Sequence, residues 1–375
     1  MQTQNHPAIE AFSDCKFCSI ISKAAGEDPI GTAGTVDHWL IMELPQPWTE
    51  KVFTEDPKIA SFLKIIKKLI IKQGIKLRPL LITPDKTYSQ PNEVRVMYYR
   101  RPQIQFAAFA KQEYILPEPK SAPLIQEILQ KIGGKPNNLE QYKQYLQLTD
   151  HIREIMICTH GNVDAACSRF GYPLYKKIRD EYAIQGDPST NSTPELRVWR
   201  CSHFGGHRFA PTLIDMPTGQ YWGHLTEDKM KQLLQRRGDI IELKNNYRGW
   251  SGLSKFEQIA ERELLQKYGW NWLTYQRSGR TLRKGGLIGI KRFIYPIARF
   301  IPLKLIQFLL DQWTDKATWA EVEIEFSASA QTSSSTYRAR VEEDKSVMTA
   351  SQSPKPDKTI KLQLLPQYSV HQLID

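Results

Sequence analysis

The chain has 375 residues, of which 41% are hydrophobic and 24% are charged. These proportions are ordinary for a globular protein and exclude a wholly disordered or fibrous chain. Lys and Arg number 51 against 40 Asp and Glu, and the resulting net charge of +11 would suit an acidic protein, an anionic membrane surface or a nucleic acid. At roughly 150 residues per domain, the length predicts two or three domains.

Neither a targeting segment nor a membrane span is recognisable in the sequence. No uncharged run reaches the ~18 residues that a spanning helix needs, and residues 1–11 lack the basic and apolar regions of a secretory signal. The five cysteines do not form the disulfide framework of a secreted protein, which favours a reducing compartment. We therefore expect a cytoplasmic protein.

The chain begins with a segment, residues 1–34, that carries a C-x-x-C pair formed by Cys15 and Cys18. An α/β unit is predicted over residues 35–148, because apolar runs alternate there with helical patterns. Its elements, in chain order, are a strand at 39–42, an amphipathic helix with a basic outer side at 59–70, strands at 80–82, 94–99 and 105–109, and a polar helical connector at 122–148.

A second α/β unit is predicted over residues 149–245. Its elements, in chain order, are a strand at 155–157, a helix at 173–185, a strand at 196–199, a hairpin at 211–225 and a helix at 226–234. The first strand leads directly into Cys158 and the second leads to His203. The order strand, helix, strand, hairpin, helix is typical of a thioredoxin-like domain, and a duplication of this unit is the one internal repeat that the sequence suggests.

The remaining residues, 246–375, are predicted to form a basic helical segment followed by a small antiparallel β region. Nine Lys and Arg but no Asp or Glu lie between Leu264 and Leu310. The stretch 277–304 interleaves basic with aromatic and aliphatic residues, so it could lie on an anionic membrane surface; the alternative is a pair of partly buried helices. Strands are expected from alternating or apolar runs at 322–326, 337–341 and 360–364, with a polar loop over 345–358.

Two pairs of candidate metal ligands lie in the second unit. Cys158 and Cys167 have the spacing C-x8-C, and His203 and His207 have the spacing H-x3-H. Each pair begins where a strand ends, which is where α/β proteins place their sites. Two thiolates and two imidazoles could hold zinc or a [2Fe–2S] cluster. A gap of eight is too long for a zinc knuckle, and the two glycines between the histidines disfavour a helix, so an iron–sulfur cluster is the better interpretation.

Two further residues of this region have less specific patterns. Cys201 lies on the strand before His203 and is expected to pack as a structural residue. His160 is either an orienting residue behind the site or a turn residue.

The strings Cys-Thr-His-Gly…Cys at 158–167 and His-Phe-Gly-Gly-His at 203–207 resemble the sucrase/ferredoxin-like family. Weaker similarity to bacterial members covers the strings at 15–18 and 39–48, so the resemblance extends over roughly residues 15–234. It implies a thioredoxin-fold [2Fe–2S] ferredoxin in which the two cysteines, 158 and 167, hold one iron and the two histidines, 203 and 207, hold the other. The sucrase label does not transfer, since no pair of carboxyl groups suited to a glycosidase stands out.

We therefore expect a [2Fe–2S] electron-transfer protein rather than a catalyst. Two imidazoles in place of two thiolates leave the oxidised site nearly neutral, so its potential should exceed that of plant-type ferredoxins and depend on pH. The electrons would come from a protein redox partner, because no flavin or nicotinamide fingerprint is recognisable. No nucleic-acid-binding motif is recognisable either.

Two alternatives from other classes stay open. The first is a thioredoxin-like thiol oxidoreductase that uses Cys15 and Cys18, with a structural zinc at the Cys2His2 site. The C-x-x-C pair could also be half of a metal site. It precedes any strong strand, however, which favours two incidental thiols. The second alternative is a peripheral membrane adaptor whose metal site is structural.

Overall fold

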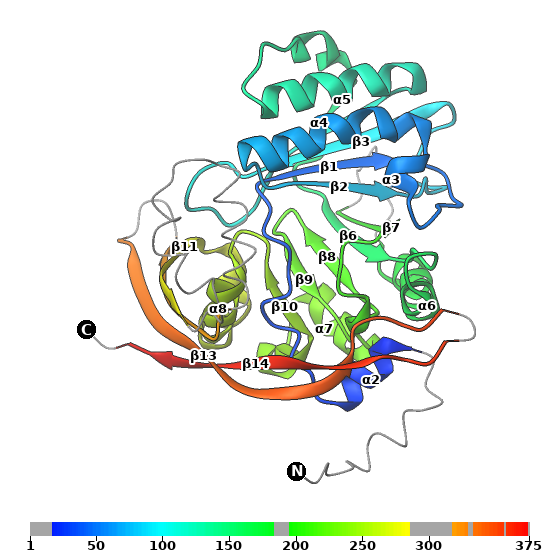
Figure 1. Ribbon diagram of the computed structural model, residues 1–375. Coiled ribbons are helices and arrows are strands. Elements are labelled where there is room, and N and C mark those ends of the chain that lie inside the picture. The colour runs from blue at the N-terminus through cyan, green and yellow to red at the C-terminus, as the bar shows by residue number, and fades with distance from the viewer. Residues whose placement is uncertain (1–16, 184–194, 286–316, 329–332, 356–357, 374–375) are drawn as a thin grey trace.

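The computed structural model describes residues 17–183, 195–285, 317–328, 333–355 and 358–373. Its centre is a ten-stranded mixed sheet with the strand order β10-β9-β8-β6-β7-β2-β1-β3-β4-β5 (Figure 1). A second sheet contains four antiparallel strands, in the order β11-β12-β13-β14. The expected α/β class with an additional small antiparallel region is therefore confirmed.

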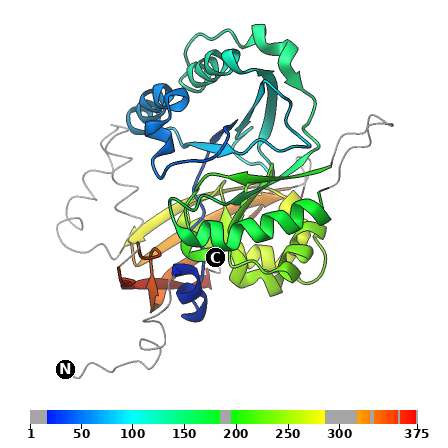
Figure 2. The same ribbon diagram turned by 90° about the vertical axis from the view of Figure 1, so that its right-hand side faces the viewer.

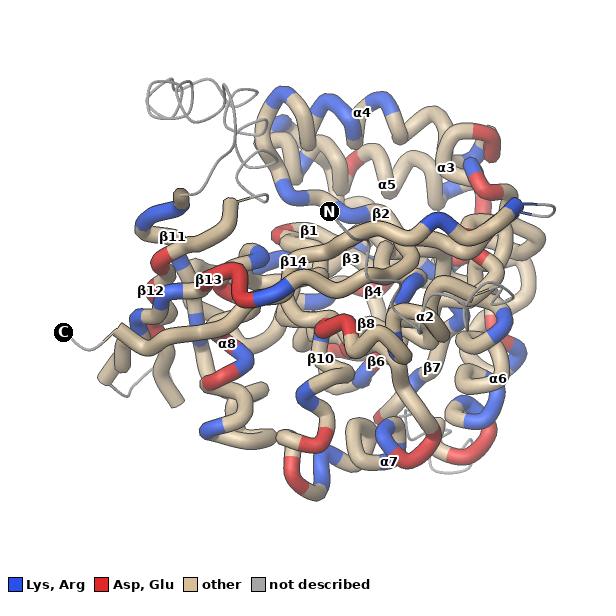
Figure 3. Tube along the Cα trace, turned by 60° about the horizontal axis from the view of Figure 1, so that its bottom comes forward, with Lys and Arg blue, Asp and Glu red and all other residues tan. Residues whose placement is uncertain are grey.

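The first half of the large sheet is one α/β unit. Its elements are β1 (His38–Glu43), α3 (Val52–Glu55), α4 (Pro57–Gln73), β2 (Leu77–Ile82), β3 (Glu93–Arg100), β4 (Ala110–Pro117), α5 (Glu118–Ile132), η1 (Leu139–Tyr145) and β5 (Leu146–Gln147). β1 and β2 are parallel, whereas β3 and β4 follow as antiparallel strands. Asp56 caps α4, which buries Ile59, Phe62 and Ile66 and carries a row of Lys residues on its outer side (Figure 3).

The second half of the sheet repeats this connectivity. Its elements are β6 (Arg153–Cys158), α6 (Ala165–Glu181), β7 (Leu196–Cys201), η2 (His207–Phe209), β8 (Leu213–Met216), β9 (Gln220–Trp222), α7 (Glu227–Gln235), η3 (Ile240–Asn246) and β10 (Tyr247–Trp250). β6 and β7 are parallel, and β8 and β9 are antiparallel. The two halves thus share the predicted order strand, helix, strand, hairpin, helix, and in both the helices lie on the outside of the strands (Figure 2).

The two halves meet where β2 pairs antiparallel with β7, with Ile82 opposite Cys201. A buried ion-pair network also connects them. Nζ of Lys111 on β4 lies 2.7 Å from carboxylate oxygens of both Glu113 and Glu154, and Arg197 on β7 lies 2.8 Å from Glu113. Because buried charges are costly unless paired, this network ties β4 of one half to β6 and β7 of the other.

The C-terminal part contains helix α8 (Lys255–Tyr268), η4 (Gly269–Thr274) and strands β11 (Gln276–Gly285), β12 (Trp319–Ser327), β13 (Ser335–Ala350) and β14 (Leu362–Gln372). Phe256, Ile259 and Leu264 of α8 share a hydrophobic cluster with Val322 and Ile324 of β12. The hairpin of β13 and β14 runs across the molecule to the short N-terminal helix α2 (Cys18–Ala24), as Figure 1 shows. Helix α2 and the connection between β13 and β14 therefore meet beside the second unit.

One expectation for the first unit is wrong, and a second is confirmed only in part. The expected strand at 105–109 is a loop, and the strand follows at Ala110–Pro117. The aromatic residues of this loop are buried for another reason: the ring of Phe106 packs on Trp250, with the two ring centroids 4.7 Å apart. The expected helical stretch at 122–148 is confirmed in part: residues 122–132 belong to α5, which buries Leu124 and Ile128, and residues 139–145 form η1.

Three expectations for the rest of the chain also need correction. Helix α6 begins at Ala165, because Asp164 caps it, and Pro173 lies inside the helix. Strand β13 continues to Ala350, into the region expected to be a polar loop. The start of the expected basic helical segment is strand β11, and residues 286–304 of that segment lie outside the described residues.

Candidate metal centre

The backbone brings Cys158 and Cys167 together. Cys158 is the last residue of β6, and Cys167 lies in the first turn of α6. The loop between them ends at Asp164, whose side chain accepts a hydrogen bond from the N–H of Ala166 at 2.9 Å. Both thiols are buried. The C-x8-C spacing thus corresponds to a strand end, a loop and a capped helix start.

The pKa values of the two thiols are shifted in opposite directions. Contact with Cys167, followed by His203, holds the pKa of Cys158 well below its usual range. The neighbouring Cys158 and burial raise the pKa of Cys167. The two sulfurs therefore differ in how readily they lose a proton, as each must when it binds a metal.

His203 lies beside these thiols because β7 is the parallel neighbour of β6, so both strands end at the same edge of the sheet. Nδ1 of His203 is 3.8 Å from the sulfurs of both Cys158 and Cys167. The backbone N–H of His203 donates to Nδ1 of His160 at 3.5 Å, and Nε2 of His160 lies 3.0 Å from the carbonyl of Thr49. His160 thus bridges the second strand end to the first unit, as an orienting residue would.

The loop from His203 to His207 is bent by glycine. Gly205 and Gly206 have φ angles of 97° and 77°, in the left-handed region that favours glycine. A Cβ atom on Gly206 would lie 2.2 Å from Nη2 of Arg248. The expected loop conformation between the histidines is therefore confirmed, and the two imidazole rings lie with their centroids 5.3 Å apart.

His207, however, is directed differently from His203. Its Nδ1 lies 3.0 Å from Oδ2 of Asp164 and 3.5 Å from Sγ of Cys18. Among the described residues, the donor atoms form two groups, each with all atoms within 4.8 Å of one another: one contains Cys158, Cys167 and His203, and the other contains Cys18, Asp164 and His207. The structure thus brings three of the predicted ligands into one group and places the fourth next to it.

Two residues of this centre were missed from the sequence. The pattern Asp-x-x-Cys at 164–167 is a helix N-cap signal that could have moved the helix start forward and indicated Asp164. Cys18 was considered only with Cys15, which lies outside the described residues. Burial, followed by the nearby Asp164 carboxylate, raises the pKa of Cys18 to about 12. Cys201 packs in the core cluster that also contains Cys158, in keeping with a structural role.

A buried cation lies beneath the histidine loop. Arg248 donates hydrogen bonds to the carbonyl oxygens of Gly205 and Thr32, at 3.1 and 2.9 Å. These oxygens are neutral, and burial lowers the pKa of Arg248 to about 9. A positive charge at this depth stabilises negative charge nearby, because the protein interior screens it weakly.

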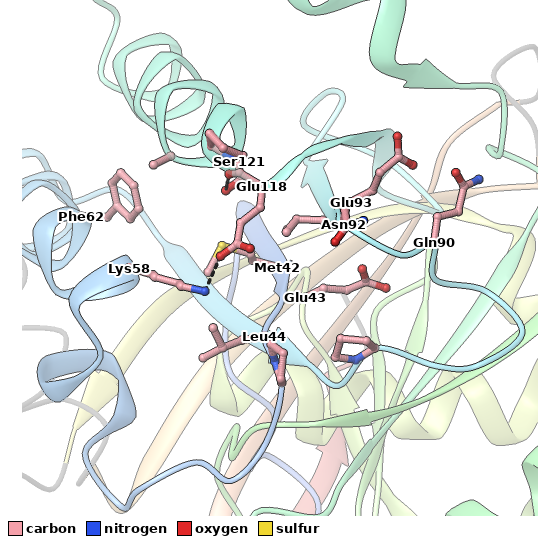
Figure 4. Close-up of a pocket in the computed structure, with 15 residues that line it drawn as sticks. Met42, Glu43, Leu44, Lys58, Phe62, Gln90, Asn92, Glu93, Glu118 and Ser121 are labelled. Atoms are coloured by element: carbon pink, nitrogen blue, oxygen red, sulfur yellow. Dashed lines mark hydrogen bonds and ion pairs between the residues drawn. The ribbon is translucent and has the colours of Figure 1, made fainter.

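The first unit has a carboxylate at the position that corresponds to Cys158. Glu43 ends β1 opposite Ile82, as Cys158 ends β6 opposite Cys201. Its carboxylate accepts hydrogen bonds from Ser89 and from the backbone N–H of Arg95. A cavity of about 480 Å³ opens here, with an ion pair between Lys58 and Glu118 at its side (Figure 4). The four predicted ligands therefore lie in the second unit, although the two units share their connectivity.

The described helices include none long and apolar enough to cross a membrane. The sequence profile of the family described as Sucrase/ferredoxin-like matches residues 29–249, more than half of the chain. No curated protein and no solved structure matches the chain. The matched region contains Asp164 and all four predicted ligands, whereas Cys18 lies outside it.

Proposed function

This chain belongs to the sucrase/ferredoxin-like family, and we propose that it is an electron-transfer protein whose [2Fe–2S] cluster is held by four residues, Cys158, Cys167, His203 and His207. The observation that carries the proposal is the meeting of two buried thiols with the imidazole of His203. Cys158 ends β6, His203 follows the neighbouring strand β7, and Cys167 lies in the first turn of α6. The donor set fits a cluster of this type, since thiolate and imidazole are both ligands of two-iron centres. Such a cluster supplies one-electron chemistry when bound.

The surroundings favour the reduced state of such a centre. Two neutral imidazoles add less negative charge than two thiolates would, and the buried Arg248 adds positive charge beside the loop. Both effects make an added electron more stable, so we expect a potential above that of plant-type ferredoxins. Imidazole ligands can also release a proton on oxidation, which would make the potential depend on pH.

The imidazole side is also where electrons would enter. The side chain of His207 is 20% exposed, whereas both cysteine sulfurs are buried. We propose that a protein redox partner docks over the histidine loop, and the net charge of +11 would favour an acidic one. We also propose a reducing cytoplasmic location, in keeping with the four free thiols among the described residues. Binding of 277–304 to an anionic membrane stays a prediction.

Anaerobic purification followed by visible absorbance and iron and sulfide analysis tests the cluster. We expect a reddish-brown protein with about two irons and two sulfides per chain. Cys158→Ser should abolish the colour, and His207→Cys should shift the absorbance bands. Cys201→Ser is the matched control, because Cys201 is a buried cysteine of the adjacent strand that belongs to neither donor group. A colourless wild-type protein would contradict the proposal.

A single structural zinc is the second candidate. It is favoured by one observation: the donor atoms of Cys158, Cys167 and His203 lie as close together as the ligands of one tetrahedral ion. Stoichiometric zinc without sulfide in the purified protein would identify this candidate. The thiol oxidoreductase alternative stays a prediction, because Cys15, the first thiol of its C-x-x-C pair, lies outside the described residues. The second thiol, that of Cys18, is buried.

A further inference from the structure

Asp164 is the point at which four segments of the chain meet. Its side chain is 2% exposed and caps α6 through the N–H of Ala166. Nδ1 of His207 lies 3.0 Å from Oδ2, and Ser353 donates to the two oxygens from Oγ at 2.7 Å and from its backbone N–H at 2.8 Å. Sγ of Cys18 lies 3.7 Å away. We call the side chains of Asp164, Ser353 and Cys18 the Asp164 clasp.

The contacts of the clasp determine which nitrogen of His207 carries a proton. Both carboxylate oxygens of Asp164 accept hydrogen bonds, from the N–H of Ala166 and from the Oγ and backbone N–H of Ser353, as an ionised carboxylate does. An ionised carboxylate only accepts hydrogen bonds. Nδ1 of His207 is therefore the donor to Asp164, which leaves Nε2 as the ring nitrogen that can bind a metal.

His203 presents the opposite nitrogen. Its Nδ1 lies 3.8 Å from the sulfurs of both Cys158 and Cys167, within the group of donor atoms. The two imidazoles of the H-x3-H loop therefore differ in the position of Nδ1: that of His203 lies near the sulfurs, and that of His207 lies at Asp164. This difference follows from their surroundings, because only His207 has a carboxylate at Nδ1 among the contacts of the described residues.

We propose that Asp164 is a positioning residue for His207: it holds the Nδ1 proton and leaves Nε2 as the ligand atom, whereas His203 binds through Nδ1. A carboxylate behind a metal-bound histidine fixes the orientation of the ring and strengthens it as a ligand. This inference rests on the proposed function, since it assigns the ligand atoms of that cluster.

A different arrangement would have Cys18, Asp164 and His207 hold a separate metal ion, because their donor atoms lie within 4.8 Å of one another. The hydrogen bonds of Asp164 argue against this. A carboxylate offers about four lone pairs. Four nitrogen and oxygen donors already occupy them, namely the N–H of Ala166, Oγ and N–H of Ser353, and Nδ1 of His207. The thiol of Cys18 donates to the same oxygens at 3.7 and 3.8 Å. A metal ion would have to displace one of these buried contacts.

Through the clasp, the C-terminal part of the chain also contacts the candidate metal centre. Ser353 follows β13 and contributes two hydrogen bonds to Asp164. Its Oγ also accepts from the backbone N–H of Cys18 at 3.2 Å. The hairpin of β13 and β14 therefore completes the surroundings of His207 from outside the region that the family profile covers.

Isotope labelling with pulsed EPR tests the ligand atoms directly on the wild-type protein. Histidine carrying 15N at Nδ1 alone is incorporated, and the nitrogen couplings of the reduced cluster are measured. We expect one 15N and one 14N coupling, from His203 and His207 respectively. Two 15N couplings or two 14N couplings would overturn the inference while leaving the cluster in place. Absence of any iron–sulfur signal would instead reject the proposed function.

Substitutions within the clasp test its effect on the potential. Asp164→Asn keeps a capping oxygen but removes the charge, so it should weaken His207 as a ligand and raise the reduction potential. Ser353→Ala removes a donor from the carboxylate, which should strengthen its bond to His207 and lower the potential. Shifts in the same direction, or no shift, would contradict the inference, since mere loosening of the structure does not predict opposite signs.

Matched controls for both substitutions lie in the first unit. Asp56→Asn changes another N-cap aspartate, which accepts from the N–H of Lys58. Ser89→Ala removes another hydroxyl that donates to a carboxylate, that of Glu43. Neither control should alter the potential. A shift of equal size in a control would also count against the role of Asp164.

Discussion

A Cβ atom on Gly171 would lie 2.1 Å from the carbonyl oxygen of Cys158. Only glycine therefore lets helix α6 pass this close to the end of strand β6. The approach matters because Cys167 lies one helical turn before Gly171, on the same helix. The close approach of the Cys158 and Cys167 thiols therefore depends on glycine at position 171.

Gly171→Ala should consequently impair both stability and metal binding. The added methyl group meets backbone rather than a flexible side chain, so we expect a loss of about 1–3 kcal/mol in the free energy of unfolding. Urea denaturation and iron analysis measure the two effects. Gly34→Ala is the control, because its nearest neighbour is the end of a tyrosine side chain at 3.3 Å. Equal stability of both variants would contradict this account.

Lys111→Met should destabilise the connection between the two α/β units. The substitution leaves Glu113 and Glu154 with less compensation in the interior, and removing one partner of a buried ion pair costs about 3–5 kcal/mol. Chemical denaturation should show an earlier midpoint. Lys143→Met, which removes an exposed partner of Glu140, should change stability by less than about 1 kcal/mol. The prediction fails if the two variants unfold alike.

The stability of the metal-free protein should fall as the pH is lowered from about 6.5 to about 3. Burial, followed by Lys23, lowers the pKa of His224 from its ordinary value of 6.5 to about 3. Between these values the unfolded chain binds a proton that the folded chain excludes, so stability rises with pH, by up to about 1.4 kcal/mol per unit.

His224→Asn should flatten that dependence. Asn tolerates the positive φ of 52° at this position and does not titrate. The comparison uses unfolding free energies of both metal-free proteins at several pH values. Identical slopes for wild type and variant would show that other groups cause the effect.

Arg248→Met should lower the reduction potential of the cluster. The substitution removes a buried positive charge beneath the histidine loop, and an added electron is then less stable. Spectroelectrochemical titration measures the change. Arg280→Met is the control, because Arg280 is exposed and pairs with Glu323 in the small sheet. An unchanged or higher potential in Arg248→Met, with the cluster intact, would contradict the electrostatic role.

The sequence by itself determined the local features of this protein. Periodicity predicted β1, α4, β6 and β7, and the spacing of Cys158, Cys167, His203 and His207 predicted where a metal centre would lie. Glycines 205 and 206 predicted a loop between the histidines. These features depend on residues close in the chain, so their physical causes can be recognised in a short stretch of sequence.

Only the tertiary structure decided how His207 is held. Cys18 and Ser353 are 335 positions apart, yet they meet at Asp164 because the C-terminal hairpin crosses the molecule to reach helix α2. The aromatic residues at 105–109 misled in the same way, since their burial comes from packing on Trp250 rather than from a strand. Contacts of this kind depend on how distant segments pack, and local sequence patterns carry no record of that packing.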